Sequence, residues 1–166
     1  MHSIVLIGMP GCGKSTVGRR LSELLDIPFL DTDDVIQARS GQKLQTMIDA
    51  EGIDRFLEWE ADAVCSLAPQ HAVIATGGSV VYRERAMRHL HALGTVVYIQ
   101  VSFEEIERRI HNLSSRGIAL REGQTLRALY DERIPLYEAQ ADVTVCTDAM
   151  SAQVAAQEII RRAGLL

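Results

Sequence analysis

The sequence lacks paired cysteines, long apolar runs and any excess of basic residues, and each absence argues against a class of protein. Its three cysteines are widely spaced and odd in number, so they indicate neither a disulfide framework nor a metal site, and a reducing cytoplasmic location is expected. No apolar stretch is long enough to cross a bilayer, so we expect no membrane partner. The net charge of −5 disfavours a nucleic-acid partner, because nucleic acids attract clustered positive charge.

The composition is that of an ordinary globular protein. Hydrophobic residues make up 47% and charged residues 23% of the 166 residues, which is enough for a core without disulfides or metals. There are no internal repeats, low-complexity segments or linkers. We therefore expect one domain over residues 1–166, acting as a monomer.

Strand-like and helix-like apolar patterns alternate along the chain. Strands are expected at 3–7, 27–30, 71–75, 95–100 and 143–145. Helices are expected at 14–25, 34–39, within 41–51, and at 53–68, 83–92, 103–111, 124–139 and 151–163, with Pro69 and Pro135 at helix ends. Residues 112–123 are polar and lack periodicity, which is typical of a mobile lid. The alternation predicts an α/β fold with a parallel sheet covered on both faces.

A glycine-rich segment follows the first predicted strand and opens the first predicted helix. It reads Gly8-Met-Pro-Gly-Cys-Gly-Lys14-Ser15-Thr16 and matches G-x-x-x-x-G-K-[ST]. Its glycines let main-chain N–H groups close around an anion, and the helix N-terminus adds a positive dipole end. Lys14 can reach the β- and γ-phosphates of ATP, and the Ser15 hydroxyl can bind Mg²⁺. The alternative, a glycine turn that binds nothing, does not account for the Lys-Ser-Thr in register.

Two carboxylates follow the second predicted strand. Asp31 and Asp33 are one strand period apart, so they point the same way if the strand persists. Ligands bind at the carboxyl ends of parallel strands, and these side chains suggest that Mg²⁺ and a hydroxyl group are handled there. The alternative for Asp33 or Asp34 is the N-cap of the helix at 34–39.

These segments and several others, in order over nearly the whole length, resemble the shikimate kinase family. The matching segments are Gly8–Thr16, Leu30-Asp31-Thr32-Asp33, Glu51-Gly52 followed by Phe56-x-x-x-Glu60, Ala75-Thr76-Gly77-Gly78-Ser79, Arg109 seven residues before Arg116, and Arg133-Ile-Pro-Leu-Tyr137 before Ala141-Asp142. The glycine loop alone would be unspecific. The Asp-Thr-Asp and Arg-x-Pro-Leu-Tyr segments make the resemblance strong.

The resemblance implies a three-layer α/β/α P-loop kinase fold with a five-stranded parallel sheet, a lid at about 112–123 and a substrate-binding subregion at about 32–60. It implies ATP and Mg²⁺ as cofactors. The implied ATP-binding residues are Gly11, Cys12, Gly13, Lys14, Ser15, Thr16, Arg109 and Arg116, and the implied metal-binding residues are Ser15 and Asp31. The implied residues for a small carboxylate substrate are Asp33, Leu57, Gly77, Gly78 and Arg133. Lys14, Asp33, Arg116 and Arg133 would be catalytic.

Three of these residues are arginines with distinct implied roles. Arg109 would flank the adenine, Arg116 would be the lid arginine, and Arg133 would hold the substrate's carboxylate. A planar guanidinium grips a carboxylate through two hydrogen bonds. The alternatives are an exposed loop charge for Arg116 and a helix-surface charge for Arg133.

One departure from the family's pattern bears on the acceptor. Leu57 stands where the family places an arginine that helps to hold shikimate, and losing such a partner costs roughly 1.5–3 kcal/mol. The alternative for Leu57 is a place in the core, because it shares an apolar helix face with Ala61, Val64 and Ala68. If the acidic Glu58 or Glu60 reaches the pocket, a zwitterion would fit better than a simple anion. We therefore expect a kinase of amino-acid biosynthesis that transfers the γ-phosphoryl group to a small hydroxy acid, with homoserine as the acceptor.

Other interpretations stay open. A genuine shikimate kinase making shikimate 3-phosphate could recruit another cation, Arg83 or Arg121. A non-catalytic nucleotide-binding regulator and a nucleoside-monophosphate kinase share the loop, but neither requires the Asp-Thr-Asp segment together with Arg133. Cys12 is either a reactive thiol beside Lys14 or simply a small loop residue.

Overall fold

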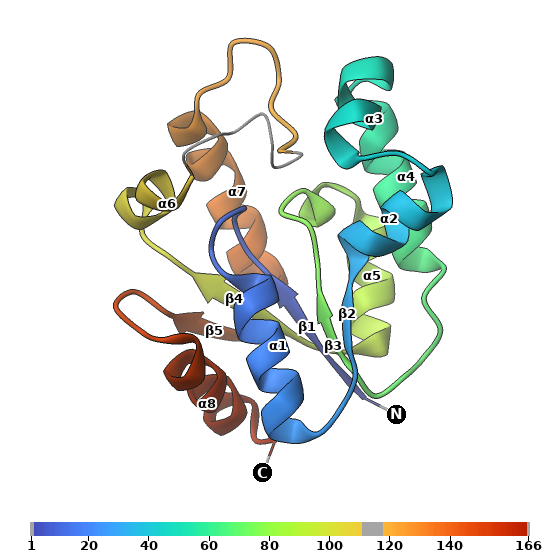
Figure 1. Cartoon of the computed structure of the whole chain (residues 1–166). Coiled ribbons are helices and arrows are strands. Elements are labelled where there is room, and N and C mark those ends of the chain that lie inside the picture. The colour runs from blue at the N-terminus through green and yellow to red at the C-terminus, as the bar shows by residue number, and fades with distance from the viewer. Residues whose placement is uncertain (1, 111–117, 166) are drawn as a thin grey trace.

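A five-stranded parallel sheet organises the molecule, as the sequence predicted (Figure 1). The computed structural model describes residues 2–110 and 118–165. The strand order is β2-β3-β1-β4-β5. The strands are β1 (Ser3–Ile7), β2 (Phe29–Asp31), β3 (Val73–Ala75), β4 (Gly94–Gln100) and β5 (Val143–Cys146).

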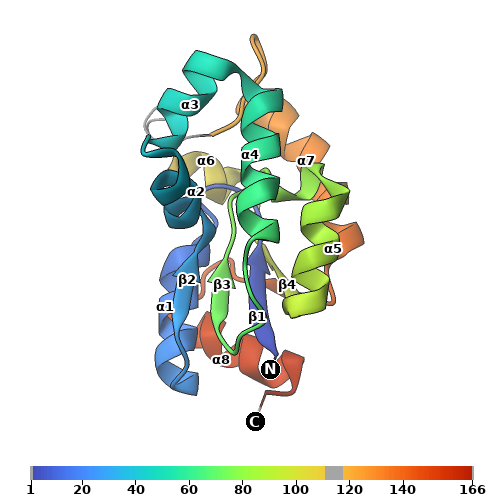
Figure 2. The ribbon, with the colours of Figure 1, turned by 90° about the vertical axis from the view of Figure 1, so that its right-hand side faces the viewer.

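Helices cover both faces of the sheet, which makes the three-layer arrangement (Figure 2). The helices are α1 (Lys14–Leu25), α2 (Thr32–Ser40), α3 (Leu44–Glu51), α4 (Ile53–Cys65), α5 (Glu84–Leu93), α6 (Phe103–Arg109), α7 (Leu126–Gln140) and α8 (Ala152–Ala163), with a 3₁₀ turn η1 (Val80–Tyr82). Helices α1 and α8 pack together on one face, and α4, α5 and α7 cover the other. Among the described residues, no helix combines the length and apolar character needed to span a membrane.

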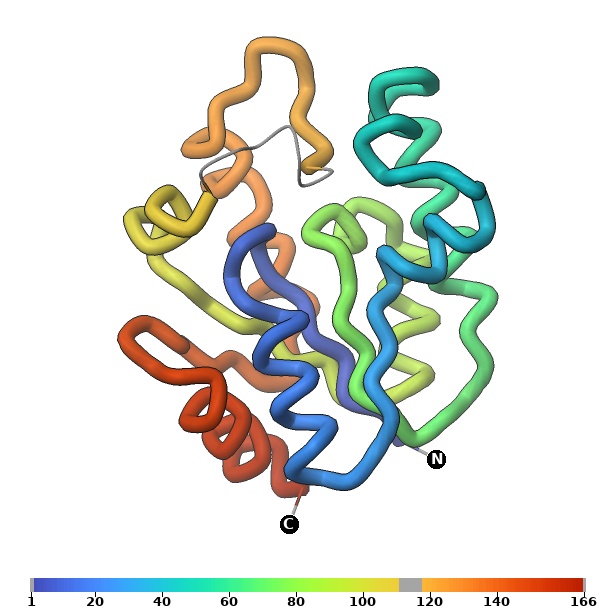
Figure 3. Tube along the Cα trace, in the orientation of Figure 1, coloured from blue at the N-terminus to red at the C-terminus, as the bar shows by residue number. Residues whose placement is uncertain are grey.

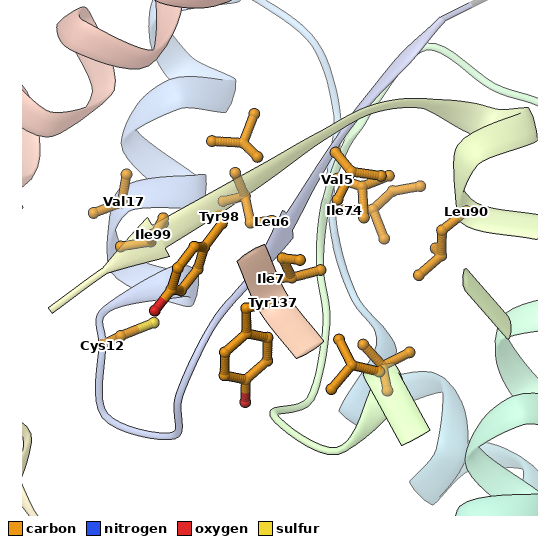
Figure 4. Packing of buried hydrophobic residues seen from close by; sticks show 14 of the residues in the cluster. Val5, Leu6, Ile7, Cys12, Val17, Ile74, Leu90, Tyr98, Ile99 and Tyr137 are labelled. Atoms are coloured by element: carbon orange, nitrogen blue, oxygen red, sulfur yellow. The ribbon is translucent and has the colours of Figure 1, made fainter. Parts of the chain in front are cut away.

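The core is built on the central strands, which are buried on both sides. Residues Ile4–Ile7 are at most 1% exposed, which explains why β1 reads as a continuous apolar run rather than an alternating one. Figure 4 shows Tyr98 of β4 and Tyr137 of α7 beside these strands, with Cys12 in the same cluster. The two tyrosine rings stack with their centroids 5.2 Å apart. This packing fixes α7 against the sheet.

Because the strands are parallel, their carboxyl ends lie along one edge of the sheet. The loops after β1, β2 and β3 gather at this edge, and both ends of the described chain lie at the opposite one (Figure 3). Segments that are far apart in sequence therefore meet at the loop edge.

The start of α2 differs from the prediction. Strand β2 ends at Asp31, whose side chain accepts a hydrogen bond from the Asp33 amide at 2.9 Å, so Asp31 is the N-cap and neither Asp33 nor Asp34 has that role. Asp31 has the extended backbone that a cap requires, φ −109° and ψ 122°. The helix begins at Thr32 instead of residue 34.

The helix expected at 124–139 is present as α7, but Pro135 does not mark its end. Helix α7 continues through Pro135 to Gln140. Proline has no N–H, so the carbonyl of Asp131 loses its helical donor. Pro135 and Asp131 are both exposed, so water can donate to that carbonyl instead. Helix α4 ends at Cys65, ahead of the position that Pro69 suggested.

The predicted lid at 112–123 lies partly outside the described residues. Its described part, Ile118–Gly123, forms no helix or strand.

We predict that Gly94→Ala disrupts the pairing of β1 and β4. A β-carbon on Gly94 would lie 1.8 Å from the carbonyl oxygen of Ser3, the residue with which Gly94 pairs. The control is Gly123→Ala, where a β-carbon would meet no atom of the described residues within 4 Å and the cost of the left-handed backbone is about 1–2 kcal/mol. Urea unfolding should show a clearly larger loss for Gly94→Ala, and an equal loss would contradict this register.

Candidate active site

A cavity of about 730 Å³ opens at the loop edge of the sheet. The glycine loop, the start of α2, one face of α4, the turn after β3, and residues from α6, α7 and α8 line it. The predicted site residues that line it are Gly11, Cys12, Gly13, Lys14, Ser15, Thr16, Asp31, Asp33, Gly77, Gly78, Arg109 and Arg133. The fold therefore brings the predicted nucleotide and acceptor residues of the described chain to one place, with the exception of Leu57.

The glycine loop curls around the ammonium group of Lys14. Lys14 Nζ donates hydrogen bonds to the carbonyl oxygens of Gly8, at 2.7 Å, and Met9, at 3.0 Å. Gly11 and Gly13 have φ values of 80° and 94°, which only glycine adopts easily. Helix α1 begins at Lys14, so its first N–H groups face the same space as the ammonium. This is the geometry of an anion site.

Ser15 and Asp31 supply oxygen atoms at one side of the loop. Ser15 Oγ donates to Asp31 Oδ2 at 2.9 Å. Hydroxyl and carboxylate oxygens suit Mg²⁺, which keeps waters and phosphate oxygens in its shell and needs few protein ligands. The donors present fit Mg²⁺ bound together with a nucleotide.

Two carboxyl groups converge on Gly77 in the wall of the cavity. A β-carbon on Gly77 would lie 2.7 Å from Glu60 Oε2 and 3.0 Å from Asp33 Oδ1. Burial raises the pKa of Asp33 to about 6, and nearby Asp31 adds to the shift. Burial also raises the pKa of Glu60 to about 7, although the hydrogen bond from Ser79 partly offsets it. Asp33 therefore remains ionised at neutral pH and can accept a proton.

Arg133 lies opposite these carboxyls and is only 1% exposed, so it is not a helix-surface charge. Its Nε donates to the Tyr82 hydroxyl and its Nη2 to the Ala119 carbonyl, each at 3.2 Å. A β-carbon on Gly78 would lie 2.7 Å from Pro10 Cδ and 2.8 Å from Arg133 Nη1, which explains the need for glycine there. The Tyr137 hydroxyl donates to the Gly78 carbonyl at 2.6 Å and so holds this turn against α7.

The buried charged side chains of the described residues are Lys14, Glu60 and Arg133, and all three line this cavity. Within that part of the chain, none of the three forms an ion pair. Buried charges without partners are costly unless a ligand completes them. The cavity is therefore the functional site that the structure favours.

Comparison with known proteins agrees with the sequence resemblance. Residues 10–163 match the family model described as shikimate kinase. The chain is 42% identical to the shikimate kinase of Chromohalobacter salexigens, over 98% of this chain and 92% of that protein. It is 39% identical to shikimate kinase 1 of Citrobacter koseri, over 96% of this chain and 94% of the relative.

This chain belongs to the shikimate kinase family. Among solved structures it resembles the shikimate kinase from Acinetobacter baumannii in complex with shikimate, with a TM-score of 0.88, 34% identity and coverage of 97% of this chain and 92% of that one. The shikimate kinase from Aquifex aeolicus matches with a TM-score of 0.81 and 31% identity, over 96% of this chain and 94% of that one. As a member of this family the chain is a small-molecule kinase that phosphorylates a hydroxyl group, as the sequence predicted.

Leu57 is the exception among the expected substrate residues. It is 2% exposed and lies in a buried apolar cluster with Leu44 and Phe56, but it does not line the cavity. The structure thus favours the interpretation of Leu57 as a core residue, and a contact between Leu57 and substrate stays a prediction. The neighbouring Phe56 and Glu60 line the cavity instead.

The proposed replacement cations for Leu57 are engaged elsewhere. Arg83 Nε pairs with Glu58 at 2.6 Å, which also takes Glu58 away from the cavity. Arg121 lies 3.4 Å from Asp54, and neither arginine lines the cavity. Of the two acidic residues Glu58 and Glu60, it is therefore Glu60 that lines the cavity.

Two of the remaining predicted residues, Arg109 and Cys12, contact or belong to the glycine loop. Arg109 Nη1 donates to the Gly11 carbonyl at 3.3 Å, so it braces the loop from α6. Cys12 is 1% exposed within the core, which favours the interpretation of a small packed residue over a reactive thiol. Arg116 lies outside the described residues.

Sequence reasoning missed the segment after β5. Thr147, Met150 and Ser151 line the cavity beside the glycine loop. The available signal was their position, because Thr147 directly follows the last parallel strand. It also missed Tyr82 as a partner of Arg133, since a tyrosine in a short 3₁₀ turn carries no motif.

We predict that Glu60→Gln stabilises the ligand-free fold in a pH-dependent way. The folded pKa of about 7 exceeds the usual 4.5, so the carboxylate destabilises the fold above pH 7, and this penalty fades as the pH falls toward 4.5. The gain at pH 8 should be on the order of 3 kcal/mol. It should shrink strongly by pH 5 in urea unfolding.

The matched control is Glu58→Gln, two residues away in the same helix. Glu58 is ion-paired with Arg83 and Arg85, so its removal should bring no gain at pH 8. A Glu60→Gln effect of equal size at pH 8 and pH 5 would contradict the assignment of a buried titrating carboxyl.

Proposed function

We propose that the protein transfers the γ-phosphoryl group of ATP, in the presence of Mg²⁺, to a hydroxyl of shikimate, giving shikimate 3-phosphate. The observation that carries this proposal is the pair Asp33 and Arg133, which faces the same cavity as the phosphate loop. An acceptor that carries a hydroxyl and a carboxylate meets both residues. The relatives named shikimate kinase support shikimate as that acceptor.

The nucleotide half of the site would act through position and charge. Lys14 and the N-terminus of α1 would hold the β- and γ-phosphates, and Ser15 with Asp31 would hold Mg²⁺, Asp31 through water. Mg²⁺ supplies charge neutralisation on the phosphate oxygens when it is bound. Arg109, braced on Gly11, lies where it could flank the adenine.

The acceptor half would orient the hydroxyl and take its proton. Arg133 would bind the carboxylate, because its guanidinium is buried, charged and held in place by Tyr82 and Ala119. Asp33 would then accept the proton of the attacking hydroxyl. Its pKa of about 6 leaves it ionised at pH 7 while making it a better base than an ordinary aspartate.

Homoserine was the acceptor that the sequence favoured, and the relatives do not support it. That expectation rested on the absence of a cation at Leu57 and on an acidic group in the pocket. The second condition is met by Glu60, which keeps an amino-acid acceptor as the alternative to be assayed beside shikimate. The non-catalytic regulator is disfavoured because Lys14, Asp33 and Arg133 all converge on the cavity.

The remaining features fit an enzyme of the cytoplasm. Cys12, Cys65 and Cys146 all lie in the described part of the chain and are unpaired, in keeping with the reducing compartment that we propose. We propose a monomer as the working state, which light scattering can test.

We predict that the wild type phosphorylates shikimate with MgATP and that Lys14→Ala abolishes transfer. The variant should keep its fold, because Lys14 donates to the loop carbonyls of Gly8 and Met9 but is a buried charge without an ion-pair partner in the described chain. A coupled ADP-release assay and circular dichroism make the measurement. Turnover of Lys14→Ala at the wild-type rate would refute the role of this loop.

We predict that Arg133→Lys raises the KM for shikimate at least tenfold and leaves the KM for ATP within threefold. Lysine keeps the charge but loses the planar fork that grips a carboxylate. The control Arg127→Lys alters an exposed arginine of the same helix and should change neither constant. Equal effects on both substrates would argue against an acceptor role.

A further inference from the structure

Glu60 is a buried carboxyl that the proposed reaction does not use. It is 2% exposed and lines the cavity. The Ser79 hydroxyl donates to its Oε1 at 2.8 Å, whereas its Oε2 has no hydrogen-bond partner among the described residues. Buried oxygens are almost always hydrogen-bonded, so a free one in a cavity wall points to a ligand.

Glu60 is not part of an internal ion pair in the described chain. Position 57, one turn earlier on the same helix face, holds an apolar leucine that could not offer a charge. Arg83, which follows the 3₁₀ turn after β3, is held by Glu58. Arg133 and Lys14 lower the pKa of Glu60 through space, but neither lies within ion-pair distance of it. A purely structural role therefore leaves Oε2 unexplained.

The direction of Oε2 fixes which part of an acceptor it can meet. Glu60 Oε2 and Asp33 Oδ1 both approach the backbone of Gly77, at 2.7 and 3.0 Å from the position of a β-carbon there. The group next to Oε2 is thus a neighbour of the group that Asp33 contacts. If Asp33 faces the hydroxyl that is phosphorylated, Oε2 faces a substituent one or two carbons away along the acceptor.

We propose that Glu60 is an acceptor-specificity residue whose Oε2 binds a second hydrogen-bond donor of the acceptor, next to the hydroxyl that receives the phosphoryl group. This inference rests on the proposed function and names a further requirement of the same site. The donor is a neighbouring hydroxyl if the acceptor is a polyhydroxy acid, or an ammonium group if it is a hydroxy amino acid. Ser79 positions the carboxyl for this contact.

Two matched substrate pairs test the contact. The first is shikimate and its analogue without the hydroxyl next to the phosphorylated one. The second is homoserine and 4-hydroxybutanoate, which lacks the ammonium. For each of the four compounds, kcat/KM is measured at saturating MgATP with the wild type, Glu60→Leu and Glu60→Gln. The control variant is Glu58→Gln, because Glu58 does not line the cavity.

Removing the donor should lower the wild-type kcat/KM about 10- to 100-fold, the range for a hydrogen bond to a charged group. Glu60→Leu should impose the same loss on the full acceptor and change the kcat/KM of the truncated one less than threefold. This coupling is the signature of direct contact, because a structural defect would weaken both members equally. Glu60→Gln should retain much of the activity if the donor is a hydroxyl and little if it is an ammonium.

The failures are distinguishable. Equal losses for both members of the active pair in Glu60→Leu, or in Glu60→Gln if the leucine variant does not fold, would overturn the role of Glu60 alone. Activity with the homoserine pair only would overturn shikimate as the acceptor, and Glu60 would still be judged by that pair. Turnover of neither pair, with MgATP hydrolysis intact, would overturn both.

Discussion

The structure depends on three buried ionisable side chains, Lys14, Glu60 and Arg133, whose burial the rest of the fold must compensate. They lie around one cavity, and within the described chain the protein supplies no ion-pair partner for any of them. Their burial is costly, and the packed sheet and helices stabilise the fold against it. A nucleotide that carries phosphates, together with an acceptor that carries hydroxyls and a carboxylate, would satisfy these charges.

The fold produces this arrangement because parallel strands end at one edge. Lys14 comes from the loop after β1, the two acidic side chains Asp31 and Asp33 from the end of β2, and Gly77 and Gly78 from the end of β3. Helix α7 packs across the sheet through Tyr137, which orients Arg133 four residues earlier toward the same edge. Glycine at 78 leaves room for the guanidinium. The acceptor end of the cavity thus depends on packing far from the glycine loop.

Local patterns predicted the fold and the nucleotide half of the site well. The chemistry of a strand, a glycine loop and a helix is contained in one continuous segment, Ser3–Leu25, so its shape follows from its own residues. Asp31 and Asp33 lay close to their predicted positions although the strand does not persist beyond Asp31, because Asp31 caps α2 and Asp33 lies in its first turn. Parallel order followed from the alternation of strands and helices.

The acceptor half could not be predicted to the same depth, for physical reasons. Which neighbour on a helix faces a cavity depends on how that helix packs, and α4 turns Glu60 inward while Leu57 joins the apolar cluster. Pro135 was misjudged because solvent exposure lets a helix tolerate a missing N–H. The partners of Arg133 come from η1 and the segment 118–119, which carry no motif.

The central claim is that the acceptor's carboxylate completes the buried charge of Arg133 while its hydroxyl faces Asp33. A crystal structure of this chain with MgADP and shikimate tests it most directly. The account predicts the carboxylate within hydrogen-bond distance of the Arg133 guanidinium, and the hydroxyl that is phosphorylated beside Asp33. A carboxylate bound to another cation, with Arg133 still contacting only Tyr82 and Ala119, would contradict the account.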